Sequence, residues 1–310
     1  MRIRPITQSD IVAVRKLDAL AWAGLFPPFK KGTMKCRTLV NLATNWADDR
    51  EGCFVAEENG NLLGYVFCHV WGRLGWIGTF GVSPRYRSTG IGRKLLEKSI
   101  EHLELNGCTT IGLETRPDNT HNVGLYLAHG FRPKYLTLVM ERPVTNRSVR
   151  GKFVEWSELK KSESEAVAEK LLRICHAIQP GLDYVRMGKL RAVNGEGELV
   201  ALGRKTDPLG LAVVRTAPRF VREKFMDAFV EAMGARTVSE AEFVGMIRTL
   251  NGLASKWSKR SLVLPVSSSD WERIQTLLEH GFRLRRSLLR MMYRERAVSC
   301  RTVNMSFWAM

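Results

Sequence analysis

The amino-acid sequence predicts an α/β protein built from two tandem domains of related fold. Its 310 residues suit two domains of about 100 to 200 residues each. Strand-like runs alternate with runs whose apolar residues recur at helical spacing. Several features of the first half also recur, in the same order, in the second half. We therefore expect one α/β unit that is present twice.

The elements of the first half are predicted from periodicity and from capping and turn residues. The turn Glu58-Asn59-Gly60-Asn61 indicates a hairpin, since Asn-Gly tolerates the positive φ that tight turns require. Capping residues 7–10 precede an apolar-periodic run. The expected strands are residues 3–6, 54–56, 63–67 and 76–82, and the expected helices are residues 11–21, 39–46 and 93–105.

An internal repeat sets the predicted domain organisation. Without gaps, residues 113–140 align with residues 264–291, and His129-Gly130-Phe131-Arg132 matches His280-Gly281-Phe282-Arg283. Upstream, the dipeptides Val55-Ala56 and Leu63-Gly64 recur in the same order as Val200-Ala201 and Leu209-Gly210. We expect domains at residues 1–145 and 152–296, joined through the polar run 145–148. Residues 297–310 match neither copy and receive no role.

Composition and charge limit the class of protein. Hydrophobic residues make up 45% of the chain and charged residues 25%, which is typical of globular proteins. Because charges interrupt every apolar stretch and no apolar signal core follows Met1, we expect a cytoplasmic protein with no membrane partner. Six scattered cysteines without metal-ligand spacing predict reduced core thiols and no metal; an acyl-cysteine route is disfavoured.

The net charge of +17 means that an acidic partner has to be considered. Residues 1–145 hold 19 basic and 13 acidic side chains, and the remainder holds 29 and 18, so most of the excess lies in the second half. The densest basic patches are residues 256–260 and 283–296. A solvated strand face is the ordinary interpretation; a nucleic-acid partner is open but not favoured, because no nucleic-acid-binding motif accompanies the charge.

Residues 87–93 carry the strongest chemical signal. They follow a predicted strand and open a predicted helix, and Gly90 and Gly92 let backbone N–H groups approach an anion closely. Arg87 and Arg93 add positive charge. We call residues 87–93 the phosphate loop, because this arrangement indicates binding of a pyrophosphate.

The surrounding pattern resembles a known enzyme family. Val82-x-Pro84-x-x-Arg87-x-x-Gly90-x-Gly92 resembles motif A of the GCN5-related N-acetyltransferases. The second part of that signature also follows, as Leu113-Glu114-Thr115-Arg116, Asn119, Leu125-Tyr126 and Gly130-Phe131. The resemblance covers residues 1 to about 143, and it is greatest to the ribosomal-protein and protein N-terminal acetyltransferases.

The resemblance implies a fold, a cofactor and a set of site residues. Each domain should be a mixed, mostly antiparallel twisted sheet flanked by helices. Acetyl-CoA should be the co-substrate, and the acceptor should be an amine on a small molecule or a protein. The implied cofactor-binding residues are Phe80, Gly81 and Val82 for the pantetheine arm, Arg87, Ser88, Thr89, Gly90, Ile91, Gly92 and Arg93 for the pyrophosphate, and Asn119.

The same resemblance implies direct attack of the amine on the thioester, with Glu114 as base and Tyr126 as acid. A strand-edge carboxylate that only attracts a cationic substrate, and a tyrosine that only packs, are the alternatives. His121 and His129 are less favoured bases. Trp22, Phe26 and Phe29, beside Pro27-Pro28, close the core or, less favoured, line a substrate entrance.

The second half is predicted to lack this chemistry. The region that corresponds to the phosphate loop, residues 237–243, contains Glu240 and Glu242, which would repel a pyrophosphate. The counterparts of Glu114, Asn119 and Tyr126 are Pro265, Asp270 and Leu277. We predict an N-acetyltransferase with a degenerate second domain. The alternative is a non-catalytic acyl-CoA-binding regulatory protein whose basic second domain docks an acidic partner.

Overall fold

The computed structural model describes residues 1–23, 36–145, 151–236, 238–295 and 302–308. In the first half, the strands are β1 (Arg2–Pro5), β2 (Phe54–Glu58), β3 (Asn61–Trp71), β4 (Leu74–Val82), β5 (Thr110–Thr115) and β6 (Arg132–Pro143). The helices are α1 (Ile11–Trp22), α2 (Leu39–Asp48), α3 (Ile91–Leu105) and α4 (Thr120–Ala128), with short 3-10 turns η1 (Gln8–Asp10) and η2 (Pro84–Tyr86).

The second half repeats this order of elements, as predicted. Its strands are β7 (Phe153–Glu155), β8 (Gly197–Arg204), β9 (Asp207–Arg215), β10 (Asp227–Ala235), β11 (Ser261–Ser267) and β12 (Arg283–Arg294). Its helices are α5 (Lys161–Ile178), α6 (Tyr184–Val193), α7 (Glu240–Lys256) and α8 (Trp271–Glu279), with the 3-10 turn η3 (Trp156–Glu158). One further strand, β13 (Val303–Ser306), follows the repeat.

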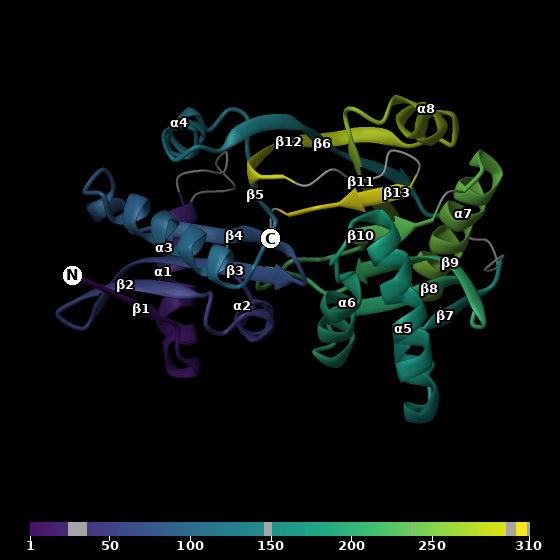
Figure 1. The fold of residues 1–310 in the computed structure, drawn as a ribbon, viewed down its shortest axis with the longest axis horizontal. Coiled ribbons are helices and arrows are strands. Elements are labelled where there is room, and N and C mark those ends of the chain that lie inside the picture. Colours follow the sequence, from purple (N-terminus) through teal and green to yellow (C-terminus); the bar gives the residue numbers. More distant parts are fainter. Residues whose placement is uncertain (24–35, 146–150, 237, 296–301, 309–310) are drawn as a thin grey trace.

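All described strands join one continuous sheet in the order β1-β2-β3-β4-β5-β12-β6-β11-β10-β9-β8-β7, with β13 paired to β10. The pairs β4–β5 and β10–β11 are parallel, and the others are antiparallel. In Figure 1, β1–β4 lie in one lobe, β7–β10 in the other, and β6 and β12 span the top between α4 and α8. The predicted mixed, mostly antiparallel sheet flanked by helices is confirmed.

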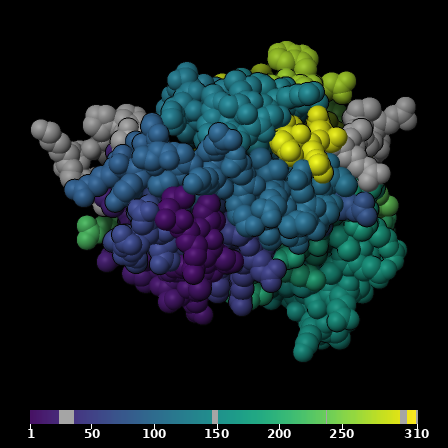
Figure 2. All heavy atoms as spheres, turned by 60° about the vertical axis from the view of Figure 1, so that its left-hand side comes forward, coloured from purple at the N-terminus to yellow at the C-terminus, as the bar shows by residue number. Residues whose placement is uncertain are grey.

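The two halves exchange their last strands. β12 of the second half pairs with β5, and β6 of the first half lies between β12 and β11. Residues from late in the sequence, coloured yellow, therefore lie against the blue and teal surface of the first half (Figure 2). As a consequence, β12 supplies side chains beside β5, at the position where a strand of the same half would otherwise stand.

Local sequence signals explain several of these elements. The predicted hairpin joins β2 and β3, with Asn59 at φ 48° and Gly60 at φ 76°. Ile11, Val14 and Leu17 of α1 are buried, in a core that also contains Leu42 and Phe67. Phe26, Pro27, Pro28 and Phe29 lie outside the described residues.

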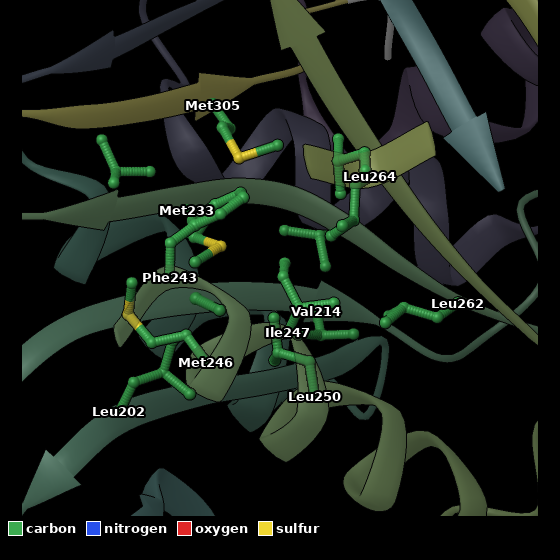
Figure 3. Packing of buried hydrophobic residues seen from close by; sticks show 14 of the residues in the cluster. Leu202, Val214, Met233, Phe243, Met246, Ile247, Leu250, Leu262, Leu264 and Met305 are labelled. Atoms are coloured by element: carbon green, nitrogen blue, oxygen red, sulfur yellow. The ribbon is translucent and has the colours of Figure 1, made fainter. Parts of the chain in front are cut away.

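The core of the second half forms between its sheet and α7. Figure 3 shows Phe243, Met246 and Ile247 of α7 facing Val214 and Met233 of the strands. Met305 of β13 belongs to the same buried cluster. The segment after the repeat is therefore part of the second half's core.

Candidate active site

The sheet of the first half opens where β4 and β5 separate. Their parallel ladder runs from Leu74↔Thr110 to Ile77↔Leu113 and ends there. β4 also has one extra residue relative to β3 between Ile77 and Phe80, a β-bulge that bends a strand and interrupts its pairing. On the β5 side, Phe80, Gly81 and Val82 therefore have backbone groups without a strand partner among the described residues. This is the region that the sequence assigned to the pantetheine arm.

The phosphate loop lies at the end of this opening. Ser88 and Gly90 adopt positive φ angles of 62° and 85°, and Gly90 is the N-cap of α3. Glycine offers no capping side chain, so the N–H groups of Ile91, Gly92 and Arg93 have no acceptor among the described residues. Two side chains of the loop anchor it to neighbouring segments of the chain. The hydroxyl of Thr89 donates to the Tyr86 carbonyl at 2.7 Å, and Arg87 Nη2 donates to the Ala21 carbonyl at 2.6 Å.

Helix α4 borders the same opening. A Cβ added to Gly92 would lie 3.5 Å from Phe80 Cζ and 3.9 Å from Leu125 Cδ2, so α3, β4 and α4 meet here. Asn119 caps α4 by accepting the Asn122 N–H at 3.2 Å. Tyr126 is 5% exposed and belongs to the buried cluster below α3 and α4. Burial raises the pKa of its phenol, which keeps the hydroxyl protonated.

Glu114 lies immediately after the last β4–β5 pair, and its side chain is fully buried. Arg290 of β12 donates to Glu114 Oε1 from Nη2 at 2.6 Å and from Nε at 3.0 Å. The Thr137 hydroxyl donates to the same oxygen, and the Trp308 N–H donates to Oε2 at 2.8 Å. Thus the predicted base is held by residues of β6, β12 and the C-terminal segment.

The C-terminal segment reaches this site from the second half. The Phe307 N–H donates to the Glu231 carbonyl at 2.9 Å. The next ring, that of Trp308, is stacked on Trp76 of β4 with ring centroids 5.8 Å apart. It also lies 3.8 Å from the Arg290 guanidinium carbon. Sequence reasoning assigned these C-terminal residues no role, because they match neither copy of the repeat.

Sequence reasoning also missed a buried His69–Asp48 pair. His69 Nδ1 lies 2.7 Å from Asp48 Oδ2, and His69 Nε2 has no hydrogen-bond partner among the described residues. This nitrogen borders the bulge of β4, since a Cβ on Gly78 would lie 2.7 Å from it. The alternation Phe67, His69, Trp71 along β3 was the available signal that His69 faces inward.

The remaining candidate residues are exposed, paired with neighbours or buried in the core. His121 is exposed, and at the C-cap of α4 His129 Nδ1 lies 2.7 Å from the Leu125 carbonyl. Arg93 is exposed and pairs with Glu97 at 2.8 Å. Cys53, Cys68, Cys108 and Cys175 are buried, and burial raises the pKa of each thiol, which makes them weak nucleophiles.

In the second half, the equivalent opening is closed by the chain itself. β10 and β11 pair only from Asp227↔Ser261 to Phe229↔Val263. Beyond that point β13 pairs with β10, from Ala232↔Ser306 to Ala235↔Val303. β13 thus occupies the groove that in the first half separates β4 from β5.

The N-terminus of α7 is closed as well. Its N-cap Ser239 accepts the Glu242 N–H, and the Glu242 carboxylate accepts the Ser239 N–H at 2.7 Å, which forms a capping box. A cavity of about 360 Å³ between α7 and α8 contains Glu240, Glu272 and Glu279. Three carboxylates and one arginine, Arg273, thus line the cavity at the position that corresponds to the phosphate loop.

Comparison with known proteins identifies the family. A family model described as the acetyltransferase (GNAT) family matches residues 15–131. A curated acetyltransferase of Pectobacterium atrosepticum is 31% identical over 128 residues, which cover 41% of this chain and 84% of that protein. The chain belongs to the GNAT family. The resemblance that the sequence motifs indicated is therefore confirmed.

Another curated relative of this GNAT protein shares less of its length with it. The mycothiol acetyltransferase of Streptomyces bingchenggensis is 33% identical over 119 residues, 37% of this chain and 38% of that protein. The chain thus matches well under half of that relative. A solved tandem GNAT protein from the clavulanic acid biosynthesis pathway has a TM-score of 0.59 and 14% identity, covering 96% of this chain and 99% of that one. At this identity the likeness concerns the fold, and it supports the tandem arrangement.

Among the residues with a described structure, none of the helices combines the length and the apolar character needed to cross a membrane.

Proposed function

We propose that this GNAT protein is an acetyl-CoA-dependent N-acetyltransferase whose catalytic unit is residues 1–145 and whose degenerate unit is residues 152–296. One observation carries the proposal: the first half has an open β4–β5 groove beside an α3 N-terminus that lacks a side-chain cap. In the second half, β13 and the Ser239–Glu242 capping box close both features. One open site of this kind therefore lies in the described part of the chain.

The residues of this site match what acetyl-CoA requires. The N–H groups of Ile91, Gly92 and Arg93 form the positive end of the α3 dipole, and this end of a helix suits a pyrophosphate. The open edge of Phe80, Gly81 and Val82 offers backbone partners to a pantetheine amide. Asn119 would add a side-chain contact. When bound there, acetyl-CoA supplies an activated acetyl group for attack by an amine.

Tyr126 is the proposed acid. Transfer of the acetyl group leaves a thiolate that must be protonated, and a phenol with a pKa raised by burial remains a proton donor at neutral pH. No hydrogen bond of the Tyr126 hydroxyl to another described residue competes with that role.

The predicted base role of Glu114 stays a prediction, and its contacts weigh against it. A general base needs a lone pair that faces the substrate. Two Arg290 nitrogens, the Thr137 hydroxyl and the Trp308 N–H already donate to the Glu114 carboxylate. These contacts favour a role in anchoring Arg290 and Trp308 beside the groove. His69, whose Nε2 lacks a described partner, is the alternative base.

The proposal is tested by calorimetric titration of the chain with acetyl-CoA. We expect one site per chain. Replacing both Gly90 and Gly92 with leucine should abolish binding. A leucine at position 90 would be strained at a φ of 85°, and a leucine at position 92 would project towards Phe80 and Leu125.

A matched control is Gly107→Leu, which strains a φ of 70° at the other end of α3 and should leave binding intact. Absence of binding at millimolar acetyl-CoA would overturn the proposal. Binding without transfer to any amine of a broad panel would favour the regulatory alternative.

A further inference from the structure

Side chains of β12 form one wall of the space beyond the end of β5. Leu289 pairs with Thr115, the last residue of β5, so earlier residues of β12 extend past that strand. Arg286 stands three residues further, about 10 Å along the strand. Leu288 packs with Phe307, and alternation places Arg286 and Arg290 on the same face as Leu288. That face also holds Glu114, the partner of Arg290. Arg286 therefore lies at the mouth of the proposed site, on the side away from α3 and α4.

Arg286 is held near this mouth by an aromatic ring. Its guanidinium carbon lies 5.4 Å from the centroid of Phe307, and that of Arg219 lies 5.5 Å from the same ring. Surrounding protein atoms desolvate Arg286, yet its side chain keeps access to solvent. A cation that is partly desolvated and still accessible is suited to bind an anion.

Within the described part of the chain, Arg286 has no ion-pair partner. Glu114 pairs with Arg290, and Asp227 pairs with Arg285 at 2.7 Å. The residues outside the described ranges contain no Asp or Glu, so their side chains add no carboxylate to this site.

Glu231, the carboxylate partner of Arg219, is shared by three arginines. Arg191 and Arg219 each lie 2.9 Å from it, and Arg215 lies 3.1 Å from it. The surroundings are thus rich in positive charge. Burial and then Arg219 and Arg285 lower the pKa of Arg286 to about 10. Burial and then Arg219 lower the pKa of Arg215 to about 9. An anion bound here would relieve this repulsion.

We propose that the acceptor amine carries an anionic oxygen group, a carboxylate or a phosphate, and that Arg286 binds this group. The proposal rests on the proposed transferase function and deepens it. The second half then takes part in substrate selection, because the strand exchange places Arg286 of that half at the active site of the first half. The basic patch at residues 283–296 is then partly a binding surface, and not only a solvated strand face.

The test compares matched amines that differ only in charge. The probes are 4-aminobutyrate against 4-aminobutanamide, and phosphoethanolamine against ethanolamine; the two pairs distinguish a carboxylate from a phosphate. Release of CoA gives kcat/KM for each probe, and calorimetry on the CoA-loaded chain gives binding. The variants are Arg286→Gln, the charge-conserving Arg286→Lys, and Arg283→Gln as a control on the same strand.

We expect the native chain to prefer the anionic member of at least one pair by about ten- to hundredfold in kcat/KM. Arg286→Gln should abolish this preference through KM, Arg286→Lys should restore part of it, and Arg283→Gln should retain it. Acetyl-CoA affinity should stay unchanged in all three variants.

The outcomes separate this proposal from the proposed function. Failure of acetyl-CoA to bind the native chain would overturn both. If acetyl-CoA binds, three results would overturn the anion site alone: equal use of both members of each pair, an equal effect of Arg286→Gln on both members, or neither transfer to nor binding of any anionic probe.

Discussion

Tyr126 is the residue whose surroundings best fit the role that the sequence assigned to it. Tyr126→Phe removes the proton donor and keeps the packed ring, so kcat should fall about a hundredfold or more. Acetyl-CoA affinity and the unfolding midpoint should change little, because no described residue bonds to the hydroxyl. The control is Tyr293→Phe, a ring 5.5 Å from Phe131 in the same cluster. Unchanged turnover in Tyr126→Phe would remove Tyr126 from the mechanism.

Glu114 can be tested for an anchoring role against a catalytic one. Glu114→Gln removes the carboxylate that pairs with the buried Arg290, so the free energy of unfolding should fall by about 3 kcal/mol. Urea unfolding measures this loss, and kcat is measured on the folded fraction. A hundredfold loss of kcat in Glu114→Gln, with His69→Gln unaffected, would establish Glu114 as the base. The opposite pattern would assign proton transfer to His69 and leave Glu114 as an anchor.

Glu231 should make stability depend on pH. Burial alone would raise the pKa of this carboxyl group, but Arg191, Arg219 and Arg215 outweigh burial and lower it from 4.5 to about 2. Because the folded pKa lies below the unfolded one, the stabilisation is complete above about pH 5 and is lost as the pH falls towards 2. The full loss should amount to about 3 kcal/mol, of which about 2 kcal/mol falls between pH 6 and pH 3. Urea unfolding at pH 6, 4 and 3 measures this loss. Glu231→Gln should have a lower free energy of unfolding at pH 6, and that energy should change less as the pH falls. The control, Glu240→Gln at an exposed position, should show the same pH dependence as the native chain.

At the scale of elements, β13 distinguishes the two halves. It pairs with β10 in the groove that stays open between β4 and β5, and it buries Met305 in the second half's core. Met305→Ala should therefore cost about 2–5 kcal/mol of stability, measured by urea unfolding. The exposed Leu284→Ala should cost less than about 0.5 kcal/mol. Equal stability of Met305→Ala and the native chain would show that β13 does not hold the groove closed.

The sequence allowed the elements to be predicted because their signals are local or repeated. Asn59-Gly60 specifies its hairpin, and the repeated His-Gly-Phe-Arg placed α8 and β12 by analogy with α4 and β6. The contacts of Glu114 were not predictable. Its partners Arg290 and Trp308 are 176 and 194 residues away. Alternation along a strand indicates which face a side chain occupies and does not indicate which strand lies beside it.

At the scale of the whole molecule, the exchange of β6 and β12 makes the halves depend on each other. In the described structure, β6 pairs only with strands of the second half, and β5 has β12 on one side. A first half expressed alone would leave the edge of β5 unpaired and β6 without its observed partners, and would expose apolar residues such as Met140. Fold class alone, which the repeat predicted, would have suggested two separable units.

We therefore expect residues 1–145 alone to be aggregated or unfolded and to bind no acetyl-CoA. Coexpression with residues 146–310 should restore a soluble complex with one acetyl-CoA site, because the break falls in the connection between β6 and β7 and leaves every described strand intact. Size-exclusion chromatography and calorimetric titration measure the two results. A monomeric, folded fragment 1–145 that binds acetyl-CoA as tightly as the full chain would contradict this dependence, since β6 would then have returned to the edge of β5 within its own half.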